Sequence, residues 1–138
     1  MASGGLDVCV GDFVRALCSG GKLVLCPKET LLSPSELLTL IHDEQIQIGE
    51  FVPAVLRGLL GYTREAGIAF PNFSYLIVGS DSWSLEEHAN AQSLLAKTTK
   101  LVNSYGVTEC TVDSTIFNST DVSPESFKGA NIGWPMHT

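Results

Sequence analysis

The sequence predicts an α/β fold, a three-layer sandwich in which helices cover both faces of a mostly parallel central sheet. Short apolar runs alternate with amphipathic helical patterns, which is typical of parallel strands joined by crossover helices. The apolar runs show little polar alternation, so both faces of the strands are expected to be buried. The chain has 138 residues, of which 44% are hydrophobic, and this suits one folded domain.

Residues 12–20 predict the first helix, and residues 22–26 predict the first strand. The segment "DFVRALCSG" is a helical pattern, and Gly20-Gly21 favours a helix end. The segment "KLVLC" is an apolar run of the length of a buried strand.

The segment from Ser33 to about Gln45 predicts the next helix most clearly. Ser33 can cap its amino end, Pro34 falls at the first helical position, and Glu36 completes a capping box. The leucines and isoleucine inside the segment form one apolar stripe. The run that follows, 46–52, predicts the second strand.

Two further helix and strand pairs complete the predicted sheet. A helical pattern over 53–65 precedes an apolar run at 75–80, which predicts the third strand. Ser84 and Glu87 form a second capping box in front of another helix. The fourth strand is predicted at 100–105.

Both ends of the chain are predicted to lie outside the folded unit. Residues 1–5, Met-Ala-Ser-Gly-Gly, are typical of a leader that is foreign to the domain. Residues 6–120 hold all the predicted elements and form the domain. Residues 121–138 are rich in turn-forming residues, which predicts a loop that leaves the domain.

Charge and composition narrow the classes of partner. The formal charge of -7, from 15 acidic and 8 basic residues, disfavours a nucleic acid or an anionic membrane as partner. No apolar run reaches the about 20 residues that cross a bilayer. The four cysteines have no C-x-x-C spacing and lie in apolar stretches, which favours reduced thiols in the core. We therefore expect a cytoplasmic protein that binds neither nucleic acid nor membrane.

Polar residues gather where the predicted strands end. Glu50 lies near the end of the second strand, Gly79-Ser80-Asp81 follows the third, and "NSYGVTE" (103–109) ends the fourth. Ligands of open parallel sheets bind at the carboxyl ends of the strands. The sequence therefore predicts a ligand site along this edge.

The segment N-x-Y-G-x-T-E, followed by Thr-Val, resembles the signature of adenylation domains of nonribosomal peptide synthetases, members of the adenylate-forming enzyme superfamily. Companion motifs occur in the family's order. "LDVC" stands where the family has F-D-x-S, with Leu6 and Cys9 as replacements, and "LCSGGKLVLCP" matches L-x-x-G-x-x-L-V-L-x-P. The resemblance covers nearly the whole chain. It departs at the Gly-Gly-Glu turn, which is Gly79-Ser80-Asp81 here, and at Val107, where proline is usual.

The resemblance implies a flavodoxin-like subdomain that carries the substrate specificity of an adenylation domain, with ATP and Mg²⁺ as cofactors in the complete domain. Tyr105 would lie against the adenine ring, Thr108 would donate a hydrogen bond to the α-phosphate, and Glu109 would bind Mg²⁺. Thr108 and Glu109 are thus the implied catalytic residues. The implied nucleotide-binding residues are Gly79, Ser80, Asp81, Asn103, Tyr105, Gly106 and Thr108.

The resemblance also implies an amino-acid pocket. Asp7 would pair with the substrate's α-ammonium group, while Glu50 and Asp113 would face its side chain. Two carboxylates in one enclosed pocket repel each other unless a cation shares them, so we expect a basic substrate. The set resembles that of ornithine-activating domains, with lysine and arginine as close competitors. The implied lining is Asp7, Val8, Gly11, Glu50, Leu76, Val78, Ser104, Val112 and Asp113.

Two details of the pocket depend on the alignment. Val78 stands where ornithine-activating domains usually have glycine, and it would narrow the cleft. A shift of one residue near Glu50 would place Gly49 in the pocket and remove the second acid.

Several functional parts of the family are not among these 138 residues. The phosphate-binding loop lies upstream in the family, and the ribose-binding aspartate, the hinge and the catalytic lysine lie downstream. The resemblance therefore implies a chain that is inactive alone and works with the remainder of an adenylation domain and a carrier-protein domain. The alternatives are an adenylation subdomain for a neutral amino acid, a non-catalytic flavodoxin-like ligand-binding module, and a structural fragment that docks a neighbouring domain.

Overall fold

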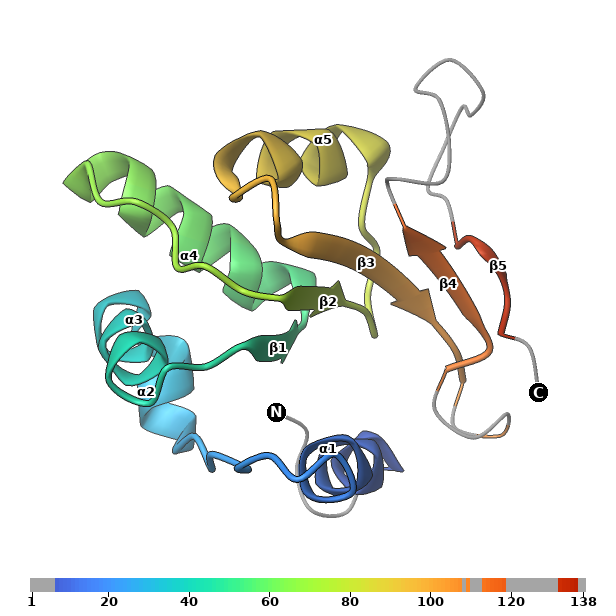
Figure 1. The fold of residues 1–138 in the computed structure, drawn as a ribbon. Helices are drawn as coiled ribbons and strands as arrows, with labels where there is room; N and C mark the ends of the chain where they lie inside the picture. The colour runs from blue at the N-terminus through green and yellow to red at the C-terminus, as the bar shows by residue number, and fades with distance from the viewer. Residues whose placement is uncertain (1–6, 108, 110–112, 119–131, 137–138) are drawn as a thin grey trace.

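The computed structural model describes residues 7–107, 109, 113–118 and 132–136. Ten helices and strands follow one another in this part of the chain (Figure 1). They are α1 (Asp7–Leu17), α2 (Lys28–Leu32), α3 (Pro34–Asp43), β1 (Ile48–Phe51), α4 (Pro53–Ala66), β2 (Tyr75–Val78), α5 (Leu85–Leu94), β3 (Lys100–Tyr105), β4 (Thr115–Asn118) and β5 (Trp134–Pro135).

The five strands form one sheet in the order β1-β2-β3-β4-β5. The pairs β1–β2 and β2–β3 are parallel, whereas β3–β4 and β4–β5 are antiparallel. The α/β class with parallel central strands is therefore confirmed. The connection 106–114 is shorter than the dozen or so residues that a parallel crossover needs, so the chain reverses direction into β4.

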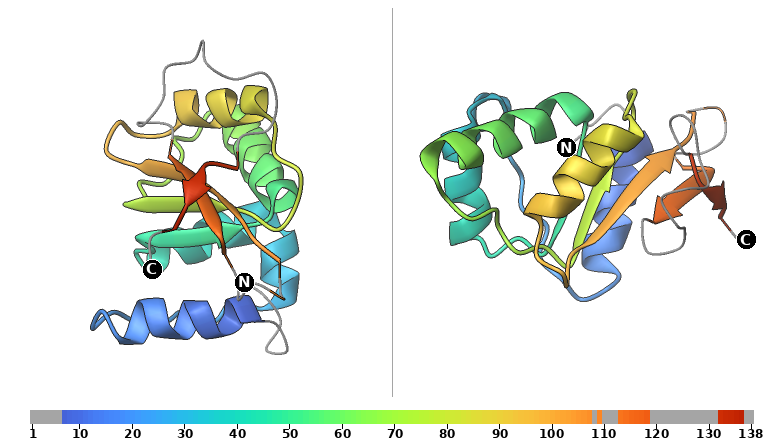
Figure 2. Two further views of the ribbon diagram at one scale, coloured as in Figure 1. Left: turned by 90° about the vertical axis from the view of Figure 1, so that its right-hand side faces the viewer. Right: turned by 90° about the horizontal axis from the view of Figure 1, so that it is seen from above.

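Helices lie on both sides of this sheet. Helices α4 and α5 lie on one side and α1 lies on the other, while α2 and α3 stand beside α4 (Figures 1 and 2). Helices α4 and α5 each connect two neighbouring parallel strands, as the alternation of the sequence predicts.

The side of the sheet that faces α4 and α5 holds the core. Phe51, Val78, Asn103 and Phe117 stand side by side across four strands, and each is less than 9% exposed. Apolar side chains from α4, α5 and the strands form one buried cluster, which includes Leu56, Leu59, Ala91, Leu76 and Leu101. The opposite face of the strands carries the alternate residues, of which Glu50 and Ile77 are neighbours in register.

Residues 22–26 do not form the predicted strand. They run as an irregular segment between α1 and α2, and Lys22 and Leu25 are exposed. A strand needs a neighbouring strand to share its backbone hydrogen bonds. A cavity separates this segment from β1, so its apolar composition alone does not produce a strand.

The two capping predictions have different outcomes. Ser84 and Glu87 form the reciprocal capping box at the start of α5. Ser33 makes no side-chain cap at α3, because it also ends α2 and its hydroxyl lies 3.4 Å from that of Ser35. The capping-box sequence therefore forms a cap at α5 but not at α3, where Ser33 is shared by two consecutive helices.

The predicted loop over 121–138 differs from the structure at its described end. Trp134 and Pro135 pair with β4 as β5, and Met136 N donates to Ser114 O at 3.0 Å. The segment "WP" is too short to give a strand pattern in the sequence. Its pairing depends on the exposed edge of β4.

The described cysteines are free thiols, and of these Cys26 packs against the core. Cys18 is exposed, and Cys9 and Cys26 are partly exposed. The expectation of core thiols is therefore wrong for Cys18 and Cys9, whereas Cys26 lies at the border of the core. Among the described residues, no helix is both long and apolar enough to cross a membrane.

His88 links α5 to β4 in the interior. Trp83 Nε1 donates to His88 Nδ1 at 3.4 Å, and the His88 ring lies edge-on to Phe117 with centroids 5.2 Å apart. Within the described residues, His88 Nε2 is buried without a hydrogen-bond partner. Burial lowers the pKa of His88, so the neutral imidazole is the stable form in the folded chain.

The free energy of unfolding should therefore fall as the pH drops below the unfolded histidine pKa of about 6.5, because the unfolded chain then binds a proton that the folded chain resists. Urea unfolding at pH 7.5 and 5.5 measures this difference. The variant His88→Gln should lose part of the decrease. His42→Gln is the matched control, since the His42 side chain is 88% exposed. Equal decreases in the parent and His88→Gln would contradict this role of His88.

Candidate functional site

The carboxyl ends of the three parallel strands meet at one edge of the sheet. Phe51 of β1 is in register with Val78 of β2, which is in register with Asn103 of β3. The residues around these ends therefore lie close together, as the sequence predicts: Glu50 on β1, the turn after β2, and Tyr105 at the end of β3.

Gly79 follows β2 at a point of close approach to β3. A Cβ atom at Gly79 would collide with Ser104 Oγ and would lie 3.1 Å from Ser104 O. The backbone N–H of Gly79 donates to Phe51 O at 3.4 Å. Only glycine fits this position without displacing Ser104.

Ser80 has a left-handed backbone, with a φ of 66°. A non-glycine residue in this conformation costs roughly 1–2 kcal/mol, which explains why the family usually has glycine here. The carboxylate of Asp81 accepts a hydrogen bond from Ser82 N at 2.6 Å and holds the turn. The turn after β2 thus keeps its shape despite its departure from Gly-Gly-Glu.

The implied nucleotide-binding residues of β3 differ in exposure. Tyr105 is 48% exposed, so its ring is available to a ligand. Asn103 is 7% exposed and stands between Val78 and Phe117 on the core side of the sheet. Its side chain therefore faces the interior rather than the open edge, which contradicts a direct contact with a nucleotide.

Glu109 and Thr108 carry the implied catalytic roles. Glu109 is exposed, and Thr108 lies outside the described residues. No group of three His, Cys, Asp or Glu side chains gathers for a metal in the described part of the chain. A lone carboxylate still fits Mg²⁺, which proteins usually hold through one or two carboxylates together with phosphate groups and water.

Leu76 and Val78 do not belong to the predicted amino-acid pocket. Both are 0% exposed in the core beneath α4 and α5, whereas Glu50 lies on the opposite face of the sheet. Successive side chains of a strand point to opposite faces, so Leu76 and Val78 cannot share a pocket with Glu50.

Ile77 and Gly79 lie on the side of β2 that borders Glu50 and Ser104. Ile77 is the register neighbour of Glu50, and Gly79 approaches Ser104. Side chains of a strand alternate between its two faces, so counting back two residues from Gly79 gives Ile77. This alternation is the signal in the sequence that could have identified both residues. The predicted positions Leu76 and Val78 therefore face the core, while the predicted positions Glu50 and Ser104 share the other face of the sheet.

The remaining pocket residues are only partly described. Gly11 lies on α1 with no atom within 4 Å of where its Cβ would be, so it borders open space. Asp113 is partly buried, interacts with other groups, and lies just before β4. The side chains of Asp7 and Val8, and the whole of Val112, lie outside the description.

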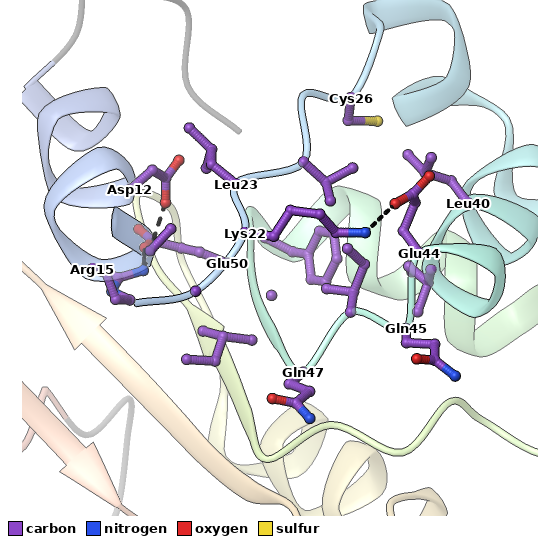
Figure 3. A pocket seen from close by; sticks show the side chains of 18 of the residues that line it. Asp12, Arg15, Lys22, Leu23, Cys26, Leu40, Glu44, Gln45, Gln47 and Glu50 are labelled. Atoms are coloured by element: carbon purple, nitrogen blue, oxygen red, sulfur yellow. Dashed lines mark hydrogen bonds and ion pairs between the residues drawn. The ribbon is translucent and has the colours of Figure 1, made fainter. Parts of the chain in front are cut away.

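A cavity of about 330 Å³ lies between α1, the segment 21–26, α3 and β1 (Figure 3). Glu50 is the only predicted pocket residue that lines it among those described. At one end, Arg15 Nη1 of α1 lies 2.7 Å from Glu50 Oε2 and 3.6 Å from Asp12 Oδ1. At the other end, Lys22 pairs with Glu44.

The charges around Glu50 were missed from the sequence. Burial, and then the Glu50 charge, raise the pKa of Asp12, while Arg15 lowers it. The signal in the sequence is the spacing of Gly11 and Arg15, which are four residues apart and lie on the same side of a helix. The part of the pocket that is predicted to bind the substrate's side chain therefore already contains a cation, Arg15.

A second and more open hollow of about 610 Å³ lies between α3 and the residues that precede β1 and β2. It is lined by Gln47 and Asn72, among others. These residues lie at the amino ends of the strands. The second hollow therefore lies away from the carboxyl ends of the strands, where the sequence predicts the ligand site, although its volume is larger.

Comparison with known proteins assigns this arrangement to a family. The family model described as "AMP-binding enzyme" matches residues 5–138. The chain belongs to the AMP-binding enzyme family. The resemblance to adenylation domains of nonribosomal peptide synthetases, carried by the motifs of this AMP-binding chain, is thereby confirmed.

Relatives of this AMP-binding chain are peptide synthases. It is 42% identical over 117 residues to gramicidin S synthase 2 of Brevibacillus brevis, covering 85% of this chain and 3% of that protein. It is 35% identical over 136 residues to tyrocidine synthase 3 of Brevibacillus parabrevis, covering 99% of this chain and 2% of that protein. The chain therefore spans a small fraction of these relatives.

A solved structure shares the fold. The nonribosomal peptide synthetase FmoA3, in its α-methyl-L-serine-AMP-bound form, superposes with a TM-score of 0.76 at 24% sequence identity. The match covers 94% of this chain and 14% of that chain. The similarity supports the α/β architecture of this AMP-binding chain.

The close approach of Gly79 and Ser104 can be tested by substitution. Gly79→Ala should lower the free energy of unfolding by about 1–3 kcal/mol, because the added methyl group displaces Ser104 and the end of β3. Ser104→Ala in the same chain should recover part of the loss, since it removes Oγ. The control is Gly61→Ala in α4, where no atom lies within 4 Å of the added Cβ and alanine favours a helix. Equal stabilities of the Gly79 and Gly61 variants would contradict the close approach.

Proposed function

We propose that this chain is the amino-acid-recognising subdomain of a nonribosomal peptide synthetase adenylation domain. The complete domain would join an amino acid to the AMP part of ATP and release pyrophosphate. One observation carries the proposal: parallel strands bring Glu50, the Gly79–Ser104 contact and the exposed Tyr105 to one edge, in the family's order. Membership of the AMP-binding enzyme family supports it.

In this reaction an oxygen of the substrate carboxylate bonds to the α-phosphorus of ATP, and the bond from that phosphorus to pyrophosphate breaks. Tyr105 supplies a ring surface for adenine, and the turn 79–81 borders the same edge. Thr108 would donate a hydrogen bond to the α-phosphate, and Glu109 would hold Mg²⁺. The ion offsets the charge of the phosphate groups. Asp7 would pair with the α-ammonium group of the amino acid.

We propose a basic amino acid, of the ornithine, lysine or arginine type, as substrate. Glu50 and Asp113 supply two carboxylates, and Gly11 leaves open space beside α1. Val78, which stands where ornithine-activating domains usually have glycine, faces the core in this chain, so its side chain does not narrow the space beside Glu50.

One observation favours a neutral amino acid instead. Arg15 already contacts Glu50 at 2.7 Å, so Glu50 does not need a substrate cation to be paired. Under this alternative the pair Arg15–Glu50 would form a neutral wall of the pocket. A panel of substrates distinguishes the two candidates.

The remainder of the adenylation domain and a carrier-protein domain are the proposed partners. The first would contribute the phosphate-binding loop and the catalytic lysine, and the second would receive the activated amino acid. A cytoplasmic location is proposed on the composition of the chain.

In a complete adenylation domain that contains this chain, Glu50→Gln or Asp113→Asn should raise KM for basic amino acids about ten- to a hundredfold, because each removes an enclosed charge-assisted hydrogen bond. KM for neutral amino acids should change much less. Pyrophosphate exchange with a panel of twenty amino acids measures both effects. Asp7→Asn is the control, and it should weaken all α-amino acids about equally. A parent that prefers a neutral amino acid would exclude the basic substrate and leave the adenylation activity standing.

The 138-residue chain alone should show no amino-acid-dependent pyrophosphate exchange, because it lacks groups that stabilise the transition state of phosphoryl-type chemistry. The same chain grafted into a complete adenylation domain should show it. Exchange by the isolated chain at the rate of the complete domain would refute this expectation.

A further inference from the structure

Arg15 stands between two carboxylates at one end of the cavity beside β1. Its Nη1 atom lies 2.7 Å from Glu50 Oε2 and 3.6 Å from Asp12 Oδ1 (Figure 3). The side chains of Glu50 and Asp12 are only 12% and 18% exposed, whereas that of Arg15 is 32% exposed. The cation is thus the most accessible of the three groups and is within reach of both acids.

The three charges do not cancel. Asp12 and Glu50 carry two negative charges, and Arg15 carries one positive charge. Burial and the Glu50 charge both raise the pKa of Asp12, while Arg15 lowers it, so negative charge is in excess at this place. One further cation would leave every carboxylate of the cluster with its own partner.

The cluster is also open to a ligand. Gly11 lies one helical turn before Arg15 on α1, and its missing side chain leaves open space within 4 Å. The cavity that Asp12, Arg15 and Glu50 line gives a long side chain access to Glu50 from the side on which Arg15 lies. A substrate cation and Arg15 would therefore compete for one carboxylate.

We propose that Arg15 is a resident counter-ion of the amino-acid pocket, which pairs with Glu50 in the empty site and turns to Asp12 when a basic side chain binds Glu50. This inference rests on the proposed basic substrate. It makes Arg15 and Asp12 specificity-determining residues outside the pocket implied by the family's motifs.

The physical reason is the cost of an unpaired charge. Glu50 without any cation would be a largely buried carboxylate, which is strongly unfavourable. Arg15 removes that cost in the empty site, and Asp12 removes the cost of an unpaired Arg15 in the occupied one. A neutral amino acid provides no cation for Glu50, so it leaves Arg15 in place and gains nothing from the exchange.

The two residues should therefore have opposite effects on the affinity for basic amino acids. In the complete adenylation domain, Arg15→Met removes the competing charge and should lower KM for the preferred basic amino acid about tenfold. Asp12→Asn removes the second partner of Arg15, holds Arg15 on Glu50, and should raise that KM about tenfold. In both variants the change in KM for the basic amino acid should exceed the change in KM for neutral amino acids.

Two controls distinguish this change of ion-pair partner from a loss of structure. Lys22→Met removes the cation at the other end of the same cavity, where Lys22 pairs with Glu44, and should leave KM unchanged. Arg15→Lys keeps the charge and should restore the parent KM. Thermal unfolding of each variant checks that it is folded, and Arg15→Gln replaces Arg15→Met if the latter unfolds.

The outcomes are distinguishable. A parent that prefers a neutral amino acid overturns the basic substrate and this inference together. A parent that prefers a basic amino acid, with KM raised or unchanged by Arg15→Met, overturns the resident counter-ion alone. Opposite shifts in the Arg15→Met and Asp12→Asn variants, with the Lys22→Met variant unchanged, support it.

Discussion

The parallel register of β1, β2 and β3 is the constraint on which the rest of the structure depends. It aligns Phe51 with Val78 and Asn103, so that one face of the sheet presents a continuous buried surface to α4 and α5. The same register sends the alternate residues, Glu50 and Ile77, to the other face. A shift of one residue in β1 would turn Glu50 toward the core and Phe51 away from it.

This register also determines the chemistry of the edge. Parallel strands end on the same side of the sheet. Three segments that are distant from one another in the sequence are therefore brought together at this edge. Gly79 then allows β2 to approach Ser104 closely, and the left-handed Ser80 carries the chain away toward α5. The backbone strain at Ser80 is thus located at the proposed nucleotide site, next to the hydrogen bond from Ser82 N to Asp81 Oδ1.

On the face of the sheet opposite α4 and α5, the charge of Glu50 is paired by a residue of α1 and not by a residue of the sheet. Arg15 reaches across from α1 to Glu50, and Asp12 stands one turn away on the same helix. The pocket proposed for the amino acid is therefore a junction between two elements that are distant in sequence. Under this proposal, its preference depends on the position of α1 against the sheet as well as on the residues of the strands.

The sequence by itself determined the α/β class, three of the strands, the helices α3, α4 and α5, and the family, because these depend on local periodicity and on motifs with fixed spacing. It also placed Glu50, Tyr105 and the turn at Gly79 on one edge. Only the tertiary structure decided which face of β2 borders Glu50, since Leu76 and Ile77 are equally apolar and differ only in the direction of the side chain. It likewise decided that 22–26 is not a strand and that Trp134–Pro135 is one, because strand formation depends on the availability of a neighbouring edge. The pairing of Arg15 with Glu50 joins residues 35 positions apart, and no local pattern encodes such a contact.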